Sequence, residues 1–225
     1  MNPAPPVTIA RTAPYRTDGV FVTFEGVDGS GKTTQARLLA EHLRNEGRPV
    51  VATREPGGTP LGERIRELLL GSDAVSPWAE AALFTAARAE LVERVIRPAL
   101  AANADVVCDR YLDSSLAYQG IARGLGVDAV LELNREAVGG ILPDRTFLLL
   151  LGVEEAATRM GRALDRIERA GAELQGRIDH AYRELAERFP DRIVALDGTL
   201  PIHELARLVT EELAARRGAA PQRRP

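Results

Sequence analysis

Short apolar runs alternate along the chain with segments of helical period. Runs rich in β-branched residues are typical of strands that are buried on both faces of a parallel sheet. Such runs occur at 20–24, 50–53, 105–108, 146–151 and 192–196. Between them, apolar residues recur with the period of an amphipathic helix. This pattern predicts helices at 33–46, 63–70, 79–101, 127–139, 154–170, 173–188 and 202–216.

The alternation of strands and helices predicts one α/β domain, with helices on both faces of a five-stranded parallel sheet. A chain of 225 residues suits a single domain, which we expect to span 19–216. Residues 1–18 hold four prolines and no apolar run, and we expect them to form a flexible leader. Residues 217–225 are expected to form a flexible basic tail.

Composition and charge exclude several classes of protein. The chain is 45% hydrophobic and 27% charged, which is ordinary for a globular protein and wrong for a disordered one. A net charge of −3 argues against a protein that coats nucleic acid. The single Cys108 excludes an intramolecular disulfide, and the three histidines lack zinc-site spacing. No run of 18 apolar residues and no signal peptide is visible, so we expect a cytoplasmic protein without a membrane or nucleic-acid partner.

The strongest motif follows the first expected strand directly. Residues 26–33 read Gly-Val-Asp-Gly-Ser-Gly-Lys-Thr and fit the phosphate-binding pattern GxxxxGK[ST]. Glycines allow a tight turn whose N–H groups face phosphate oxygens, and the helix that follows adds its positive end. We expect Lys32 to reach the β- and γ-phosphates of ATP and the Thr33 hydroxyl to bind Mg²⁺. The ATP-binding residues predicted here are Gly26, Val27, Asp28, Gly29, Ser30, Gly31, Lys32, Thr33 and Thr34.

The position of the lysine is informative because the chain otherwise uses arginine. Of the 29 basic residues, 28 are arginines, and the one lysine is Lys32. A compact ammonium fits inside a phosphate loop, whereas a wide planar guanidinium does not. GTPases that read guanine through an [NT]KxD motif, and partition-type ATPases with a KGGxxK loop, need a second lysine. Both classes are therefore excluded.

A second polar group ends the third expected strand. Asp109 stands where a carboxylate that binds Mg²⁺, directly or through water, belongs, beside the strand of the phosphate loop. Arg110 follows it and is a candidate clamp for the phosphate of a second substrate. The alternative interpretation is a salt bridge at the end of a strand. The turn at 54–59, Arg-Glu-Pro-Gly-Gly-Thr, lies at the same edge of the sheet, where ligands bind in open α/β folds, or is a plain connecting turn.

Two sets of helical residues are further candidates. Phe84 and Arg88 are four apart and share one helix face, although a phenylalanine in such a place is more often part of the core. A basic set lies in the expected helix 154–170: Arg159, Arg162, Arg166 and Arg169. These arginines form either a solvated face or a lid that excludes water and neutralises a transferred phosphoryl group.

These motifs together resemble thymidylate kinases of the bacterial type, over about 19–216. The resemblance rests on Phe-Glu-Gly-Val-Asp-Gly-Ser-Gly-Lys-Thr-Thr at 24–34 and Thr-Arg-Glu-Pro-Gly-Gly-Thr at 53–59. It also rests on Asp-Arg-Tyr at 109–111, Ser-Ser-Leu-Ala-Tyr-Gln-Gly at 114–120 and Leu-Asp-Arg-Ile-Glu at 164–168. The resemblance implies a P-loop kinase fold with strand order 2-3-1-4-5. It also implies transfer of the ATP γ-phosphoryl to thymidine 5′-monophosphate (dTMP) with Mg²⁺, and a homodimer that packs the helices at 63–70 and 79–101.

The resemblance also implies roles for single residues. Phe84 would stack on thymine, Arg88 would bind a thymine carbonyl, and Ser115 and Gln119 would contact the base edge. Tyr118 would crowd the sugar 2′ position. The remaining contacts are expected at Asp28 for the 3′-hydroxyl, at Arg54 and Arg110 near the monophosphate, and at Gly198 in the 197–199 turn for adenine. Glu55 and Pro56 are also expected to bind the substrate.

The position of the catalytic arginine is also implied by the family. The variable positions of the phosphate loop, 27–30, hold no arginine, so the chain resembles the type that carries this residue in a lid, at about 154–172. Arg162 and Arg166 are then the catalytic candidates beside Lys32 and Arg110. The family often has Phe-Phe-x-Arg after the lid, where this chain reads Leu-Gln-Gly-Arg at 174–177. The alternatives to this family are a deoxynucleoside kinase and a P-loop switch protein that hydrolyses ATP slowly.

Overall fold

The structure is a computed structural model that describes residues 19–71, 75–159 and 172–219. Its centre is one parallel sheet in the order β2-β3-β1-β4-β5. The strands are β1 (Phe21–Glu25), β2 (Val50–Arg54), β3 (Asp105–Asp109), β4 (Arg145–Leu150) and β5 (Ile193–Asp197). This confirms the predicted fold class and strand order, and each strand lies within one residue of its expected limits at either end.

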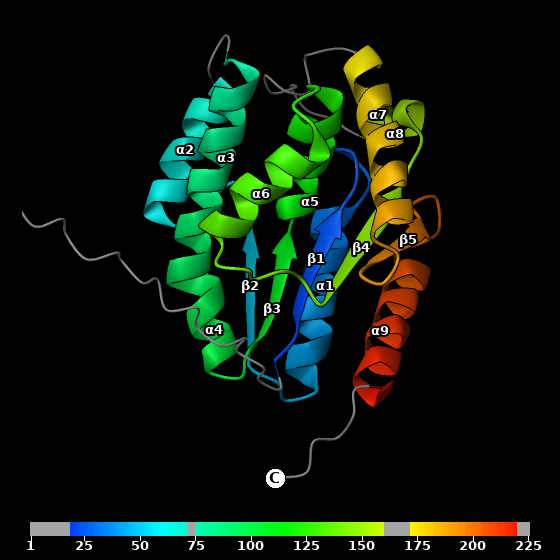
Figure 1. Ribbon diagram of the computed structural model, residues 1–225. Helices are drawn as coiled ribbons and strands as arrows, with labels where there is room; N and C mark the ends of the chain where they lie inside the picture. Colours follow the sequence, from blue (N-terminus) through cyan, green and yellow to red (C-terminus); the bar gives the residue numbers. More distant parts are fainter. Residues whose placement is uncertain (1–18, 72–74, 160–171, 220–225) are drawn as a thin grey trace, which may run out of the picture.

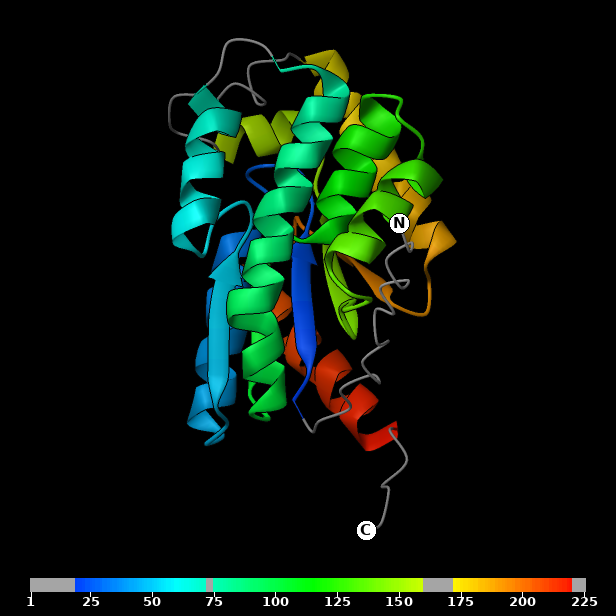
Figure 2. The same cartoon turned by 60° about the vertical axis from the view of Figure 1, so that its left-hand side comes forward.

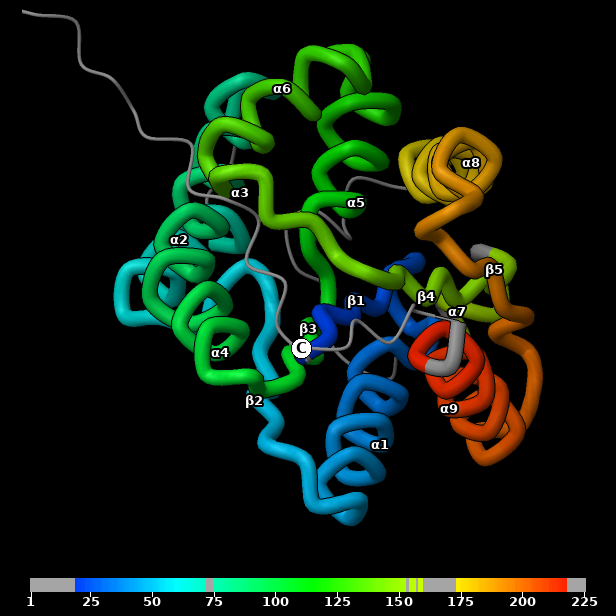
Figure 3. The backbone as a smooth tube through the Cα atoms, turned by 60° about the horizontal axis from the view of Figure 1, so that its bottom comes forward, coloured from blue at the N-terminus to red at the C-terminus, as the bar shows by residue number. Residues whose placement is uncertain are grey.

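Helices cover both faces of the sheet, as Figures 1 and 2 show. One face packs on α1 (Lys32–Asn45) and α9 (Ile202–Ala219), which lie side by side in Figure 3. Because side chains alternate along a strand, Val22 and Phe24 of β1 point into this layer, whereas Phe21 points into the other.

The opposite layer holds most of the helices. It begins with α2 (Pro60–Gly71) and α3 (Pro77–Leu91), and the latter continues through the π-helical segment η1 (Val92–Ile96) into α4 (Arg97–Ala101). The expected single helix at 79–101 is therefore continuous, but it contains a π turn. Pro98 gives a physical reason, because proline has no N–H to donate and its ring crowds the carbonyl four residues earlier.

A helical segment that the periodicity did not predict follows β3. It consists of α5 (Leu112–Ser115) and the π-helical η2 (Leu116–Ala122), and it is followed by α6 (Val127–Ala137). Nearly all of its side chains are buried, so it lacks the alternation of apolar and polar faces by which an amphipathic helix is detected. Its placement matters for the site because it carries the 114–120 motif beside β1 and α3.

The last two helices are α7 (Val153–Arg159) and α8 (Ala172–Arg188). Residues 160–171, with Arg162, Arg166 and Arg169, lie outside the described residues, as do the expected leader and most of the basic tail. The proposed lid and the domain limits therefore stay predictions. Leu174, which stands where the family often has an aromatic residue, is buried in the core, and Arg177 is exposed. Within the described part of the chain, no helix is long and apolar enough to cross a membrane.

Candidate functional site

The carboxyl ends of β1 and β3 bring the phosphate loop and the 109–111 motif together. The Thr33 hydroxyl at the start of α1 donates a hydrogen bond to Asp109 Oδ2 at the end of β3. The second oxygen, Asp109 Oδ1, is buried and has no hydrogen-bond partner among the described residues. A hydroxyl and an incompletely paired carboxylate are oxygen ligands of the kind that Mg²⁺ binds while keeping waters and phosphate oxygens. The two residues therefore fit the predicted metal site.

The phosphate loop adopts the conformation that its glycines permit. Gly26 and Gly31 have φ values of 139° and 95°, in a region that favours glycine. A Cβ atom at Gly26 would lie 2.5 Å from the Leu149 carbonyl oxygen, so a larger residue would push the loop off β4. Only glycine therefore suits this close approach.

Lys32 is held inside this loop. Its side chain is nearly buried, and Nζ donates to the Val27 carbonyl at 2.7 Å and lies 3.7 Å from Asp28 Oδ1. Burial, together with the charge of Arg110, lowers the pKa of Lys32 to about 8, while Asp28 and Asp109 act in the opposite direction. A bound phosphate would add further negative charge beside this ammonium and favour its protonated form.

Arg110 lies across the loop from Lys32. Its φ of 67° is uncommon for a residue with a side chain, and such strain is often found at functional sites. Nη1 donates to the carbonyl of Gly26 at 3.1 Å, and Nη2 pairs with Asp28. Burial alone would lower the pKa of Arg110, but Asp28 and the neighbouring tyrosines hold it above its ordinary value, so the guanidinium stays charged.

Glu25 and Tyr182 support Arg110, and sequence reasoning missed both. The Glu25 carboxylate is fully buried and accepts hydrogen bonds from Tyr111 N at 2.8 Å, Ser114 Oγ at 2.6 Å and the Tyr182 hydroxyl at 3.0 Å. Arg110 Nη1 lies 3.1 Å from both the Ser114 and the Tyr182 oxygens. Burial and the nearby Asp113 raise the pKa of Glu25. The sequence feature that could have identified Glu25 is an acidic residue at the end of an otherwise apolar strand.

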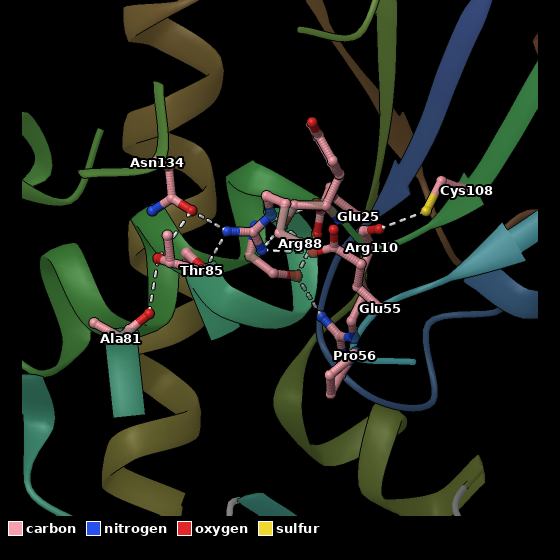
Figure 4. A network of polar contacts seen from close by, with 12 residues as sticks. Glu25, Glu55, Pro56, Ala81, Thr85, Arg88, Cys108, Arg110 and Asn134 are labelled. Atoms are coloured by element: carbon pink, nitrogen blue, oxygen red, sulfur yellow. Dashed lines mark hydrogen bonds and ion pairs between the residues drawn. The ribbon is translucent and has the colours of Figure 1, made fainter. Parts of the chain in front are cut away.

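Arg88 lies at the centre of a second network, shown in Figure 4. The side chain is fully buried, and each of its five N–H groups has a protein acceptor. Nε and Nη2 donate to Glu55 Oε2 at 2.9 and 2.6 Å, and Nη2 also donates to the Tyr111 carbonyl at 3.0 Å. Nη1 donates to Ser115 Oγ at 3.1 Å and to Asn134 Oδ1. Sequence reasoning did not identify Asn134, which comes from α6.

Glu55 joins the second network to the turn after β2. Burial raises the pKa of Glu55 to about 7, although Arg88 acts in the opposite direction. Its other oxygen, Oε1, is buried without a hydrogen-bond partner in the described ranges. The peptide bond between Glu55 and Pro56 is cis, and the Pro56 carbonyl accepts a hydrogen bond from Arg66 at 3.0 Å.

The remaining expected base and sugar contacts come from α3 and η2. Phe84 is half-buried, and Gln119 is buried and donates through Nε2 to Glu80 at 2.9 Å. The Tyr118 ring lies under the Arg110 guanidinium, 5.5 Å from its central carbon. Glu80 was missed because a buried acid on a helix has no local sequence signature.

Two expected residues lie away from these networks. Arg54 is half exposed and forms a salt bridge with Glu63 at 2.9 Å, at the open end of β2. Gly198 lies after β5, and its carbonyl accepts a hydrogen bond from Arg159 at 3.0 Å. This contact joins the end of α7 to the turn that was expected to border adenine.

Comparison with known proteins agrees with these features. The family model described as thymidylate kinase matches residues 24–209. Thymidylate kinase from Pelotomaculum thermopropionicum is 50% identical over 186 residues, which is 80% of this chain and 86% of that protein. The Symbiobacterium thermophilum enzyme is 48% identical over 208 residues, 89% of this chain and 97% of that protein. The crystal structure of thymidylate kinase from Ehrlichia chaffeensis superposes with a TM-score of 0.71 at 32% identity, covering 87% of this chain and 98% of that one.

Proposed function

Because the chain belongs to the thymidylate kinase family, we propose that the carboxyl edge of its sheet holds the phosphates of ATP and the monophosphate of dTMP. The enzyme phosphorylates dTMP to the diphosphate with ATP. The observation that carries the proposal is that Lys32, Asp109 and Arg110 meet around one loop, although they come from two separate strand ends. Two cations and a carboxylate suit a site for two phosphates and one metal ion.

On the ATP side, the loop 26–33 takes the phosphates. The N–H groups of the loop and the first turn of α1 would bind the phosphate oxygens, and Lys32 would reach the β- and γ-phosphates. Its pKa of about 8 supports this role, since the buried ammonium has more to gain from an anion than an exposed one. Gly198 would border the adenine.

Mg²⁺ would be held by Thr33 and, directly or through water, by Asp109. When bound, it would neutralise charge on the β- and γ-phosphates. Support comes from the buried Asp109 Oδ1, which has no partner in the described parts of the chain. Thr33 brings its hydroxyl to the same carboxylate.

On the dTMP side, Arg110 would bind the monophosphate, and Arg54 would turn from Glu63 toward it. Asp28, already paired with Arg110, would accept a hydrogen bond from the 3′-hydroxyl. Tyr118, which packs under Arg110, would limit space at the sugar 2′ position.

The thymine base would lie beside Phe84, with its edge toward Arg88, Ser115 and Gln119. All five N–H groups of Arg88 are engaged, so a thymine carbonyl must replace one protein acceptor. Ser115 is the acceptor most easily replaced, because its hydroxyl can rotate and donate to the base itself.

Catalysis then consists of positioning and charge neutralisation. The acceptor is already a phosphate anion, so the reaction needs no strong general base. Glu25 is a buried carboxylate directly before the loop, but its oxygens are bonded to Tyr111, Ser114 and Tyr182, which suits a supporting role. Arg162 and Arg166 remain the candidates for the arginine that neutralises the transferred phosphoryl group.

A homodimer and a cytoplasmic location complete the proposal. The faces of α2 and α3 expose the large apolar side chains of Leu61 and Trp78, which are 47% and 52% exposed. A second copy of the chain would cover them. The substrates ATP and dTMP belong to nucleotide metabolism, which supports a cytoplasmic location for the enzyme.

The function is tested by ADP release with ATP, Mg²⁺ and a panel of acceptors: thymidine, dTMP, dUMP, dCMP, AMP or none. We expect strong turnover with dTMP and weak turnover with the others. Turnover on thymidine but not on dTMP would instead identify a nucleoside kinase. Slow ADP release that no acceptor stimulates would identify a switch protein.

A further inference from the structure

Two hydrogen bonds join α3 to the α5–η2 segment on either side of Phe84. Glu80, Phe84 and Arg88 are spaced by four residues and therefore share one face of α3. At one end of this face Arg88 donates to Ser115, and at the other end Gln119 donates to Glu80. Ser115 and Gln119 are themselves four residues apart. The proposed base site is thus framed by two links between the same two helical segments.

The Glu80 link decides which way the Gln119 amide faces. A carboxylate only accepts hydrogen bonds, so it takes the amide NH₂ and cannot take the amide oxygen. Glu80 is only 1% exposed, which by itself disfavours a charge, but Arg123 lies 3.4 Å from both of its oxygens, and this positive charge favours the ionised form beside the amide. With Nε2 bound to α3, Oε1 points to the other side of the amide. In the described part of the chain, no group donates a hydrogen bond to this oxygen.

We propose that Glu80 is a specificity-determining positioning residue: it locks the Gln119 amide so that Oε1 is offered to the N3–H group of a thymine or uracil ring. This inference rests on the proposed placement of the base beside Phe84. Cytosine carries an unprotonated N3, which is an acceptor, so it would meet a second acceptor and lose the hydrogen bond. A site built to bond a donor rejects a ligand that lacks it far more strongly than a site built on shape alone. The lock would therefore favour dTMP and dUMP over dCMP.

The test compares the ratios of kcat/KM for different acceptors in variants with the same ratios in the unmodified enzyme. In Glu80→Gln the amide can turn either way, because the new side chain both donates and accepts. We expect the ratio of kcat/KM for dTMP to that for dCMP to fall at least about tenfold. The ratio of kcat/KM for dTMP to that for dUMP should change by less than about twofold from its value in the unmodified enzyme, since both bases carry N3–H. Glu90→Gln is the matched control on the same helix, because Glu90 also lies 3.4 Å from an arginine, Arg94.

A reciprocal exchange gives the sharpest readout. Gln119→Glu alone places two carboxylates together and should lower kcat/KM for dTMP. The double variant with Glu80→Gln lets residue 80 donate to residue 119, which still offers an oxygen to the base, so the preference for dTMP over dCMP should return. Gln119→Met, which removes the amide, should lose this preference.

Several outcomes would overturn the proposal. An unchanged dTMP to dCMP ratio in Glu80→Gln, or in Gln119→Met should Glu80→Gln not fold, would do so. An equal loss with all three acceptors would show a merely structural role, and failure of the exchange to restore the ratio would also count against the lock. Absence of dTMP turnover in the unmodified enzyme would instead contradict the function itself.

Discussion

The Tyr182 hydroxyl lies 3.0 Å from Glu25 Oε2, although 157 residues separate the two along the chain. Glu25 is the last residue of β1, directly before the phosphate loop. Tyr182 belongs to α8, which follows the segment that contains Arg162 and Arg166. The same hydroxyl lies 3.1 Å from Arg110 Nη1. One tyrosine therefore joins α8, the phosphate loop and the proposed dTMP clamp.

Replacing Tyr182 by phenylalanine tests this connection. The ring keeps its packing, but Arg110 and Glu25 each lose a hydrogen-bond partner. We expect kcat to fall about tenfold, because a misplaced charge stabilises the transferred phosphoryl group less well. Stability should fall by about 1 kcal/mol, the usual value of one buried hydrogen bond. Steady-state kinetics and thermal unfolding measure the two effects.

Tyr111→Phe is the matched control for this variant. Its hydroxyl is also buried and bonds a backbone carbonyl, that of Ile141, at 3.0 Å. Removing it should cost similar stability and leave kcat near the unmodified value. Equal kcat losses in both variants would show that the Tyr182 hydroxyl has only a structural role.

Lys32 predicts a pH dependence of ATP use. Its pKa is lowered to about 8 in the free enzyme, so its charge is present below this pH and is lost as the pH rises through it. The profile of kcat/KM for ATP reports the free enzyme and should fall above about pH 8. Bound phosphate stabilises the ammonium, so the fall in kcat should appear at higher pH. In Lys32→Met, whose side chain is of similar length and does not titrate, the remaining activity should be much lower and should show no fall near pH 8. Profiles that coincide with the unmodified enzyme would refute this assignment.

Asp109 predicts a dependence on Mg²⁺. In Asp109→Asn the carboxylate is lost, and we expect the Mg²⁺ concentration for half-maximal activity to rise about tenfold or more, the range seen when metal-site residues are changed. Thr33→Val removes the second oxygen and should act in the same direction, whereas Thr33→Ser keeps the hydroxyl and should stay close to the unmodified enzyme. KM for dTMP serves as the reference. An unchanged Mg²⁺ titration in Asp109→Asn would place the metal elsewhere.

The parts of the site that could be predicted are local in sequence. The phosphate loop from Gly26 to Thr33 matches a motif whose residues each have a known role in binding phosphate. The parallel topology then predicts that Asp109, at the end of β3, lies near this loop. The missed residues act through distant partners. Glu25 meets Tyr182 across the fold, and no spacing rule links two such positions.

The same limit applies to α3. Helical spacing put Phe84 and Arg88 on one face, but it could not show that Arg88 is completely enclosed by Glu55, Ser115, Asn134 and a backbone carbonyl. Burial of a charge depends on which elements pack against it, and this is a property of the whole fold. The unpredicted α5–η2 segment supplies one of these partners.

One arginine of the 154–172 segment is expected to be catalytic. Arg162→Ala and Arg166→Ala should differ in kcat, because one guanidinium would neutralise the transferred phosphoryl group and the other would not. The loss for the catalytic one should be at least about 10²-fold, the scale for a key transition-state charge. Arg169→Ala serves as a reference in the same segment. Equal and negligible losses would favour a solvated basic face.

The homodimer is tested through the apolar surface of α2 and α3. Leu61 is 47% exposed, and an aspartate there would be buried in the proposed interface, where an unpaired charge is strongly unfavourable. We expect Leu61→Asp to be a monomer by sedimentation or light scattering at concentrations where the unmodified chain is a dimer. Ile202→Asp is the matched control, since Ile202 is 54% exposed at the start of α9, on the other side of the sheet. A monomeric unmodified chain would contradict the proposed interface, and so would a dimer in Leu61→Asp. Dissociation of the Ile202→Asp dimer would instead place the interface at α9.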